Sequence, residues 1–294
     1  MTSELTNRTW KSWIEITRSR CHLHFELDGG SLDSHVAIGR NAGRHTAARI
    51  AEDLSFVPSA ILEVGSSVGF NCLALAERFP TARVVGVEPD REACMVAAAM
   101  AADCGNENTE FVQGVGLCLP FPDASFDWIV CHTVIEHVKD VDACISEMAR
   151  VLKHGGCLHL DAPNYLWPWE PHLRIIMPPL CPKSLMRFLA RLQGAGANVE
   201  YASHLKLVYP AWIERCFSCH NLRWVNRVEK KLRMAAAGEH QQIAAYGRAA
   251  KLLAILQLFG LASWLIGGLL RARLYPSLLY TACKQSNDTS DVSS

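Results

Sequence analysis

The sequence predicts an α/β protein with a doubly wound, mostly parallel sheet that carries helices on both faces. The first observation behind this prediction is that short apolar segments alternate with helical segments between residues 60 and 161, which is typical of parallel sheets. The second is a glycine-containing loop between the first apolar segment and the first helix. The third is the composition of the 294 residues, since 50% hydrophobic and 20% charged residues provide for a large core and exclude wholesale disorder.

In chain order, five short apolar segments are expected to form strands, with helices between them. The expected strands are residues 60–64, 83–87, 110–113, 126–131 and 157–161. Helical periodicity predicts helices at residues 71–79, 92–103 and 141–151. The turn Lys153–Gly156 ends the last of these helices, because glycine and nearby cations favour a helix C-terminus.

The remaining segments differ from this alternating region in composition. Residues 1–58 are expected to form an N-terminal helical segment, with the clearest helical period at Arg44–Leu54. One domain is expected over residues 59–284, and residues from about 163 to 220 are expected to cover it as a lid, rich in Pro and Trp at its start. Further elements are expected as a helix at 210–217 and strands at 222–228 and 277–283. Residues 285–294 are rich in Ser, Asp and Asn and are expected to be disordered.

Charge and cysteine usage restrict the partners and the compartment. Lys+Arg and Asp+Glu are both 29, so the chain lacks the basic excess of a nucleic-acid binder and we expect no nucleic-acid partner. The twelve cysteines are scattered, and Met1–Trp13 has no apolar leader segment. We therefore expect reduced thiols and a cytoplasmic protein.

The sharpest candidate site is the loop from Gly65 to Gly69, where the first strand becomes the first helix. Glycine permits a tight turn and a close approach of the backbone to a ligand, and a helix N-terminus offers free N–H groups. In such sheets ligands bind beyond the carboxyl ends of the strands. The alternative interpretation is a tight strand-to-helix turn without a ligand.

A second element of the same site is Glu88, at the end of the second strand. Glu88 lies 23 residues after Gly65, where an acid can accept hydrogen bonds from the two hydroxyls of a ribose. The alternative is a cap for the following helix, a role that Asp90 can fill equally well.

Further motifs follow in a fixed order, and together they carry a resemblance to a known family. They are Leu119-Pro120-Phe121, Ser125-Phe126-Asp127, Val134-Ile135-Glu136-His137-Val138 and the run Met148–Gly156. With the loop and Glu88, they resemble the class I S-adenosylmethionine-dependent methyltransferases of the small-molecule, methyltransferase type 11-like kind. The resemblance covers residues 60–165 well and extends loosely to about residue 284. It implies a Rossmann-like sheet of seven strands with an antiparallel last strand, and S-adenosylmethionine as the cofactor.

The resemblance also implies which residues hold the cofactor, with two departures from the family pattern. The implied residues are Glu63, Gly65, Ser66, Ser67, Gly69, Glu88, Pro89, Gly116, Leu117 and His132. Ser67 stands where the family has its middle loop glycine. The family's acid before Leu-Pro-Phe is missing at residues 114–116, so the adenine is expected to contact backbone N–H groups near Gly116 and Leu117.

The catalytic candidates lie after the fourth and fifth strands. They are His132, His137, Glu170 and His172. Imidazole and carboxylate groups can remove a proton from a hydroxyl near neutral pH, although His137 can instead pack at a helix start. Glu170 and His172 directly follow Trp167 and Trp169 at the start of the expected lid. The alternative is that this segment is a stiff structural element. We expect no metal, because Thr133 replaces the first Glu of the Glu-x-x-Glu-His metal motif found in methyltransferases that resemble those of ubiquinone biosynthesis.

The resemblance implies methylation, most simply of a hydroxyl on a small-molecule, sugar-linked or lipid-linked acceptor. The alternatives are N- or C-methylation of a small metabolite, or a non-catalytic subunit that binds S-adenosylmethionine. Residues 252–270 contain no charge and are long enough to span a bilayer. A buried helix, a span and an interfacial anchor over residues 251–273 at the membrane surface all remain open, the anchor with Arg271 and Arg273 at anionic head groups.

Overall fold

The computed structural model describes residues 32–196, 200, 204–237, 255–258 and 260–285. Most of the expected N-terminal segment and residues 286–294 of the expected tail lie outside this range.

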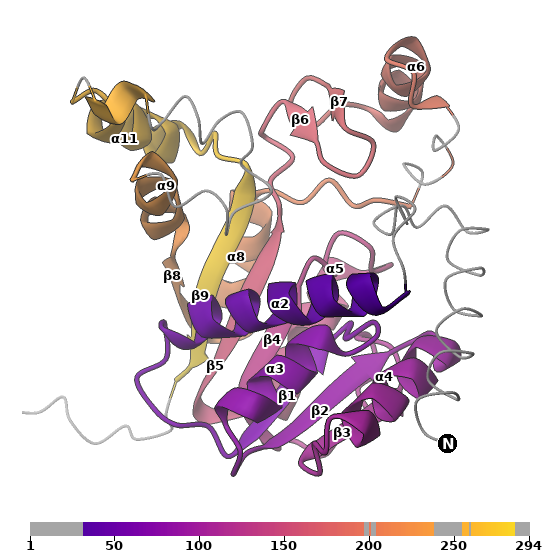
Figure 1. Cartoon of the computed structure of the whole chain (residues 1–294). Helices are drawn as coiled ribbons and strands as arrows, with labels where there is room; N and C mark the ends of the chain where they lie inside the picture. Colours follow the sequence, from indigo (N-terminus) through magenta and orange to yellow (C-terminus); the bar gives the residue numbers. More distant parts are fainter. Residues whose placement is uncertain (1–31, 197–199, 201–203, 238–254, 259, 286–294) are drawn as a thin grey trace, which may run out of the picture.

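A single seven-stranded sheet forms the centre of the molecule, in the order β3-β2-β1-β4-β5-β9-β8 (Figure 1). The strands are β1 (Ala60–Val64), β2 (Arg83–Glu88), β3 (Thr109–Gln113), β4 (Phe126–His132), β5 (Leu152–Pro163), β8 (Leu222–Asn226) and β9 (Ser277–Lys284). Strand β9 runs antiparallel to both of its neighbours, β5 and β8. Strand β1 pairs with β2 on one side and β4 on the other, so the order reverses there, at the position where such sheets bind ligands. This confirms the predicted fold class.

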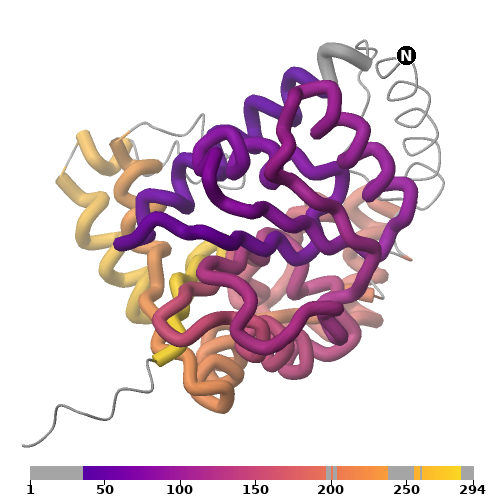
Figure 2. Tube along the Cα trace, turned by 90° about the horizontal axis from the view of Figure 1, so that it is seen from below, coloured from indigo at the N-terminus to yellow at the C-terminus, as the bar shows by residue number. Residues whose placement is uncertain are grey.

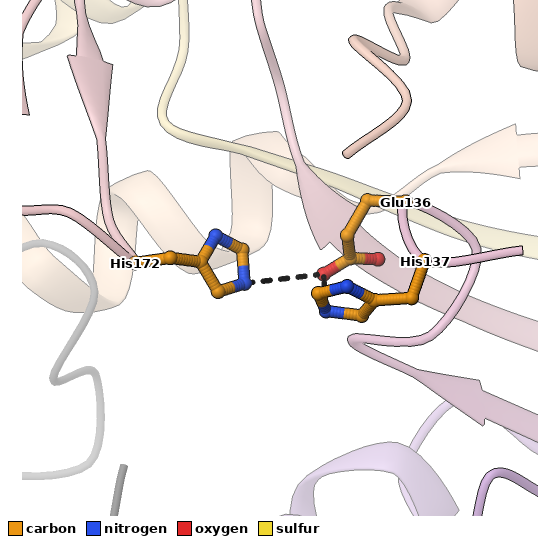
Figure 3. A group of neighbouring side chains, drawn as sticks. All are labelled: Glu136, His137 and His172. Atoms are coloured by element: carbon orange, nitrogen blue, oxygen red, sulfur yellow. Dashed lines mark ion pairs between the residues drawn. The ribbon is translucent and has the colours of Figure 1, made fainter. Parts of the chain in front are cut away.

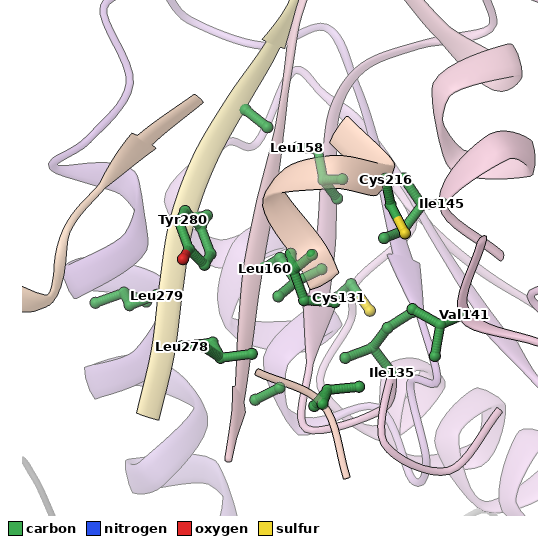
Figure 4. Close-up of a cluster of buried hydrophobic side chains, with 14 of the residues drawn as sticks. Cys131, Ile135, Val141, Ile145, Leu158, Leu160, Cys216, Leu278, Leu279 and Tyr280 are labelled. Atoms are coloured by element: carbon green, nitrogen blue, oxygen red, sulfur yellow. The ribbon is translucent and has the colours of Figure 1, made fainter. Parts of the chain in front are cut away.

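Helices cover both faces of the sheet, because alternate residues of each strand face opposite sides. One face carries α2 (Leu32–Ala51) and α3 (Phe70–Arg78), whose buried residues pack with Ile61 and Trp128. The other face carries α5 (Val141–Val151) and α8 (Pro210–Cys219), which pack on Leu158 and Leu160 (Figure 4). Helix α4 (Arg91–Asp103) follows β2.

The C-terminal elements gather at one side of the molecule (Figure 2). They include α9 (Val228–Ala236), α11 (Ala262–Ala272) and strands β8 and β9. The segment after β5 forms a short hairpin, β6 (Trp169–Glu170) with β7 (Ile175–Ile176), and then α6 (Lys183–Leu192).

Several element predictions differ from the structure. The turn expected at Lys153–Gly156 is part of β5, which starts at Leu152 and not at residue 157. The helix expected at Arg44–Leu54 already runs from Leu32 and ends at Ala51. The strand expected to reach Val228 ends at Asn226, because the Val228 N–H donates to the Asn226 side chain and α9 begins there.

The continuous apolar helix expected over residues 251–270 is also wrong for its described part. Gly260 adopts a left-handed φ of +71°, and α11 starts only at Ala262. Within the described residues, every helix is too short or too polar to cross a bilayer. The prediction for residues 251–254 lies outside the described residues.

The expectation that all cysteines are reduced is contradicted at one place. Cys157 on β5 and Cys283 on β9 form a disulfide, with their Cα atoms 4.1 Å apart. The two residues stand directly opposite each other in the antiparallel β5–β9 register, and such a pairing of distant strands cannot be derived from the spacing of cysteines in the chain. The free cysteines of the described part include Cys216 and Cys219, which share one helix.

Candidate functional site

The predicted cofactor loop is a strained turn between β1 and α3. Gly65 and Gly69 have φ angles of +75° and +81°, which L-residues with side chains rarely adopt. Val134 occupies the space that a Cβ at Gly65 would need. The N–H groups of Gly65 and Ser66 both donate to the Val87 carbonyl, at 2.7 and 3.1 Å. Backbone conformation therefore explains why glycine stands at both ends of the loop.

Ser67, at the position of the family's middle glycine, also adopts a left-handed conformation, with a φ of +47°. Its N–H donates to Glu88 Oε2 at 2.9 Å, and the N–H of Asp90 donates to Glu88 Oε1 at 3.1 Å. Burial raises the pKa of Glu88. Glu88 thus holds the loop in place, while the cap of α4 is Asp90, whose carboxylate accepts from the Glu92 N–H at 2.8 Å.

Glu63 lies beneath the loop rather than at its surface. Only 2% of Glu63 is exposed, and its carboxylate accepts hydrogen bonds from Asn71 Nδ2 at 2.7 Å and Cys72 Sγ at 3.0 Å. Burial raises the pKa of Glu63 to about 7. The structure therefore shows Glu63 bracing the start of α3, and its predicted contact with the cofactor stays a prediction.

The other predicted cofactor residues surround the same edge of the sheet. Pro89 is exposed, and Gly116 packs near Val64 and Cys144, which leave little room for a side chain there. Leu117 packs half-buried against the core. The hydroxyl of Ser66 is buried without a hydrogen-bond partner among the described residues. A glycine turn, a carboxylate at the end of β2 and an unsatisfied hydroxyl together fit a ribose-containing cofactor.

A cavity of about 750 Å³ opens at the carboxyl ends of β4 and β5. One wall is a single face of α2, made by Ile38, Asn41, Ala42, His45, Thr46 and Arg49. The other walls come from the ends of β4 and β5, from the Trp167–His172 segment and from α9. Loop residues 65–69 and Glu88 do not line it. The cavity is therefore distinct from the loop that is expected to hold the cofactor.

An imidazole–carboxylate cluster, Glu136, His137, Glu170 and His172, stands at one end of the cavity (Figure 3 draws three of the four). Glu136 Oε1 lies 3.7 Å from His137 Nε2 and 3.8 Å from His172 Nε2. On its other side, His172 Nδ1 lies 2.6 Å from Glu170 Oε1. The structure therefore brings together three of the four predicted catalytic residues and adds Glu136.

Glu170 does not line the cavity, because its carboxylate is fully buried under the lid segment. Its Oε2 accepts from the Leu173 N–H, and its Oε1 accepts from the Tyr165 hydroxyl at 3.3 Å. Glu170 thus fixes the turn of the segment and the orientation of the His172 ring.

His132, the fourth predicted catalytic residue, belongs to a separate charged group that also lines the cavity. His132 Nε2 lies 3.6 Å from Asp161 Oδ2, and the same oxygen lies 3.2 Å from Lys231 Nζ and 3.5 Å from Arg49 Nη2. Burial lowers the pKa of His132, against the opposing effect of Asp161. Although burial disfavours its charge, the neighbouring cations keep the pKa of Asp161 far below its usual range.

Next to His132, Thr133 adopts a φ of +55°, which is unusual for a β-branched residue. Backbone strain of this kind concentrates at ligand sites.

Several cavity residues were not predicted from the sequence. Arg49, Lys231 and Asp161 come from three elements far apart in the chain. The one available signal was in α2, where the cavity-lining positions recur three and four residues apart, as one helix face requires.

Comparison with known proteins identifies the central region. A family model described as a methyltransferase domain matches residues 62–160. YcgJ, an uncharacterised methyltransferase of Bacillus subtilis, is 38% identical over 96 residues, which are 33% of this chain and 37% of that protein. Ajmaline N-methyltransferase of Rauvolfia serpentina is 31% identical over 155 residues, 48% of this chain and 50% of that protein. The chain therefore spans half or less of the length of these curated relatives.

Solved structures agree with the sheet order. The YcgJ structure superposes with a TM-score of 0.51 at 20% identity and covers 83% of this chain and 99% of that chain. Phosphoethanolamine N-methyltransferase 2 of Haemonchus contortus, solved with S-adenosyl-L-methionine, gives a TM-score of 0.52 at 16% identity and covers 83% of this chain and 52% of that chain. At these identities the superpositions show the fold alone.

The sheet order defines a Rossmann-like α/β domain, and the glycine turn and Glu88 lie at the position where such sheets bind ligands. Residues 62–160 match the model of a methyltransferase domain, and the sequence motifs of this region resemble those of the class I S-adenosylmethionine-dependent methyltransferases.

Proposed function

We propose that the protein is an S-adenosylmethionine-dependent methyltransferase that methylates a hydroxyl oxygen of an acceptor bound in the cavity. The observation that carries this proposal is that the imidazole–carboxylate cluster reaches the cavity through His137 and His172, while the α2 wall of the same cavity packs on α3, the helix that follows the Gly65–Gly69 loop. When bound, S-adenosylmethionine supplies a methyl group that its sulfonium already activates.

The residues of the chain then have three tasks. The loop and Glu88 bind the adenosine part, and the face of α2 with the Trp167–His172 segment orients the acceptor and excludes water. Holding the reactants in line accounts for much of the rate, since well-oriented intramolecular reactions reach effective molarities of about 10⁵–10⁸ M. The O–CH₃ bond would form as the S–CH₃ bond breaks, and the hydroxyl proton is taken up by Nε2 of His172.

The hydroxyl is favoured over nitrogen or carbon because His172 is held by the Glu170 carboxylate on its far nitrogen. That arrangement leaves Nε2 directed to the cavity side and raises the basicity of the ring. Ajmaline N-methyltransferase, among the relatives, supports N-methylation of a small metabolite as the second candidate.

A membrane-surface contact through residues 255–273 is part of the same proposal, because it brings the active site to a lipid-linked acceptor. The described part of this segment exposes large apolar side chains: Ile255 at 53%, Leu258 at 83%, Leu261 at 50% and Trp264 at 74%. Arg271 is exposed beside them, whereas Arg273 forms an ion pair with Glu214 at 2.8 Å. Arg271 is therefore the better candidate for an anionic head group.

Two experiments test the proposal. Calorimetric titration of the purified protein with S-adenosylmethionine should show binding; its absence would refute the cofactor assignment. Incubation with labelled S-adenosylmethionine and a lipid and glycolipid extract, followed by mass spectrometry, should give a labelled methyl ether. Binding without any labelled product would favour the non-catalytic subunit.

The membrane contact is tested by sedimentation with anionic liposomes. Wild-type protein should pellet, and the double variant Leu258→Ser and Trp264→Ser should remain in the supernatant. Wild-type protein that stays in the supernatant at low salt would refute the contact.

A further inference from the structure

Glu136 is a buried carboxylate that lacks hydrogen bonds among the described residues. It is 0% exposed, and neither carboxylate oxygen has a hydrogen-bond partner among the described residues. A buried polar group in this state keeps its full desolvation cost, so native proteins rarely retain one without a ligand or a functional reason. The methyltransferase reaction proposed above does not by itself require this carboxylate.

Two imidazole nitrogens lie close to this carboxylate. Glu136 Oε1 faces Nε2 of His137 at 3.7 Å and Nε2 of His172 at 3.8 Å, as Figure 3 shows. The three side chains each offer one ligand atom, and these atoms all lie within 4.8 Å of one another. Both separations from Glu136 are too long for hydrogen bonds.

These separations approach the geometry of a metal site. Ligands at about 2.0–2.1 Å from a tetrahedral ion lie roughly 3.3 Å from each other. Relative to the observed distances, each imidazole would move toward Glu136 by about half an ångström, and a pair of ligand atoms at the 4.8 Å limit would close by about 1.5 Å. The two rings meet edge to face, with centroids 5.1 Å apart and an interplanar angle of 81°, so they reach the carboxylate from different directions.

His172 already has the hydrogen bond from its second ring nitrogen to a carboxylate that metal-binding histidines usually have. A ligating histidine normally donates its second ring N–H to a carboxylate, which fixes the tautomer and directs the other nitrogen to the metal. Nδ1 of His172 lies 2.6 Å from Glu170 Oε1, and Glu170 is itself held by the Leu173 N–H and the Tyr165 hydroxyl.

We propose that Glu136, His137 and His172 bind one divalent ion of the zinc class, with the fourth position open to the cavity. Two imidazoles and one carboxylate are the ligand set of catalytic zinc sites with an open position. His137 and His172 both line the cavity, so the open position faces the acceptor.

This site differs from the metal motif that the sequence lacks. The sequence predicted no metal because Thr133 replaces the first acid of Glu-x-x-Glu-His. In the structure the third ligand comes instead from His172, 35 residues after His137, on the segment that follows β5. That ligand could not be predicted from a local motif.

The role of the ion rests on the proposed function. An acceptor hydroxyl that binds the open position loses its proton more readily. Because the ion then occupies Nε2 of His172, the proton leaves through the cavity to water rather than to that ring. Metal binding itself requires neither the cofactor nor the acceptor, so the two proposals fail independently.

The test is a titration of chelator-treated, full-length protein under reducing conditions with Zn²⁺ by calorimetry, and with Co²⁺ by visible absorption. We expect one ion per chain in a site that the variants His172→Ala and His137→Asn lose. His137 is partly exposed, so its variant tests the site even if a change at the buried Glu136 prevents folding. Glu170→Gln should weaken binding by about 10–100-fold, as expected for an outer contact.

The matched control is His220→Asn, which removes the His220–Asp142 pair elsewhere on the molecule and should leave the affinity unchanged. Free cysteines are a competing source of zinc binding, and a thiolate-to-cobalt charge-transfer band would reveal them. The proposal is overturned if wild type takes up no more Zn²⁺ than His172→Ala, or if the bound Co²⁺ has thiolate ligands. Binding of S-adenosylmethionine, measured on the same samples, reports separately on the proposed function.

Discussion

The strongest test of the proposed cofactor site at the Gly65–Gly69 loop is the replacement Glu88→Ala. Glu88 accepts the Ser67 N–H at 2.9 Å and the Asp90 N–H at 3.1 Å. It therefore positions the loop before the cofactor arrives, and we expect it to accept the ribose hydroxyls afterwards. Alanine removes both contributions at once.

The size of the effect follows from these contacts. A hydrogen bond to a charged group contributes about 1.5–3 kcal/mol, and an orphaned buried donor costs about 1–3 kcal/mol. Since about 1.4 kcal/mol is a factor of ten in affinity, loss of the ribose contact alone should weaken S-adenosylmethionine binding roughly tenfold or more. The loss of the Ser67 and Asp90 contacts should also lower the free energy of unfolding of the unliganded protein, by about 1–3 kcal/mol.

Calorimetric titration measures the affinity, and urea unfolding measures the stability. The matched control is Glu110→Ala on the neighbouring strand β3, since Glu110 pairs with Arg83 at the exposed surface and should affect binding by less than a factor of two. An affinity for Glu88→Ala within twofold of wild type, in a folded protein, would remove Glu88 from the cofactor site.

Three further predictions address the cluster, a strand contact and the loop. His172→Ala should lower turnover by about 10²-fold or more while S-adenosylmethionine binding persists; normal turnover would leave His172 a structural role only. Burial opposes the charge of Asp127, but hydrogen bonds from Lys153 and Ser59 prevail and lower its pKa to about 2. The pKa of an Asp in the unfolded chain is about 3.9, so the lowered pKa of Asp127 stabilises the folded protein by about 2–3 kcal/mol above pH 4, and this contribution disappears as the pH falls to about 2. Asp127→Asn should therefore lower the free energy of unfolding at pH 7 but not at pH 2. An equal loss at both pH values would contradict the reasoning. Ser67→Gly removes a strained left-handed conformation that costs about 1 kcal/mol and should bind S-adenosylmethionine at least as tightly as wild type, whereas a tenfold loss would show that the hydroxyl is needed.

The sheet and the loop could be predicted because their signals are local. The apolar run Ala60–Val64, the glycines that follow it and the acid at Glu88 lie within 29 residues of one another, and each signal depends on its own backbone conformation. The strand boundaries of β1 agree with the prediction at both ends. The Asp90 cap could also be predicted from the sequence, because Asp90 directly precedes the helical period of α4.

Features that depend on tertiary packing could not be predicted. The Cys157–Cys283 disulfide requires the β5–β9 register, which pairs residues 126 positions apart. The break at Gly260 arises from backbone geometry that hydropathy does not report. Glu136 belonged to a recognised motif, but its unsatisfied carboxylate and its distance to His172 follow only from the position of the segment after β5.

The division between what could and could not be predicted also separates the two halves of the site. The family match ends at residue 160, so it includes the loop and Glu88 but not Asp161, His172 or Lys231. The cavity is completed by α2 and by elements after β5, all outside the matched region.

Relatives that share the domain can therefore share the methyl donor and still differ in the acceptor, because different segments build the wall of the cavity in which we propose that the acceptor binds. In this chain that wall holds two cations, Arg49 and Lys231, around one carboxylate. Substitutions that change the acceptor without affecting cofactor binding should accordingly lie on α2, on α9 and in the Trp167–His172 segment.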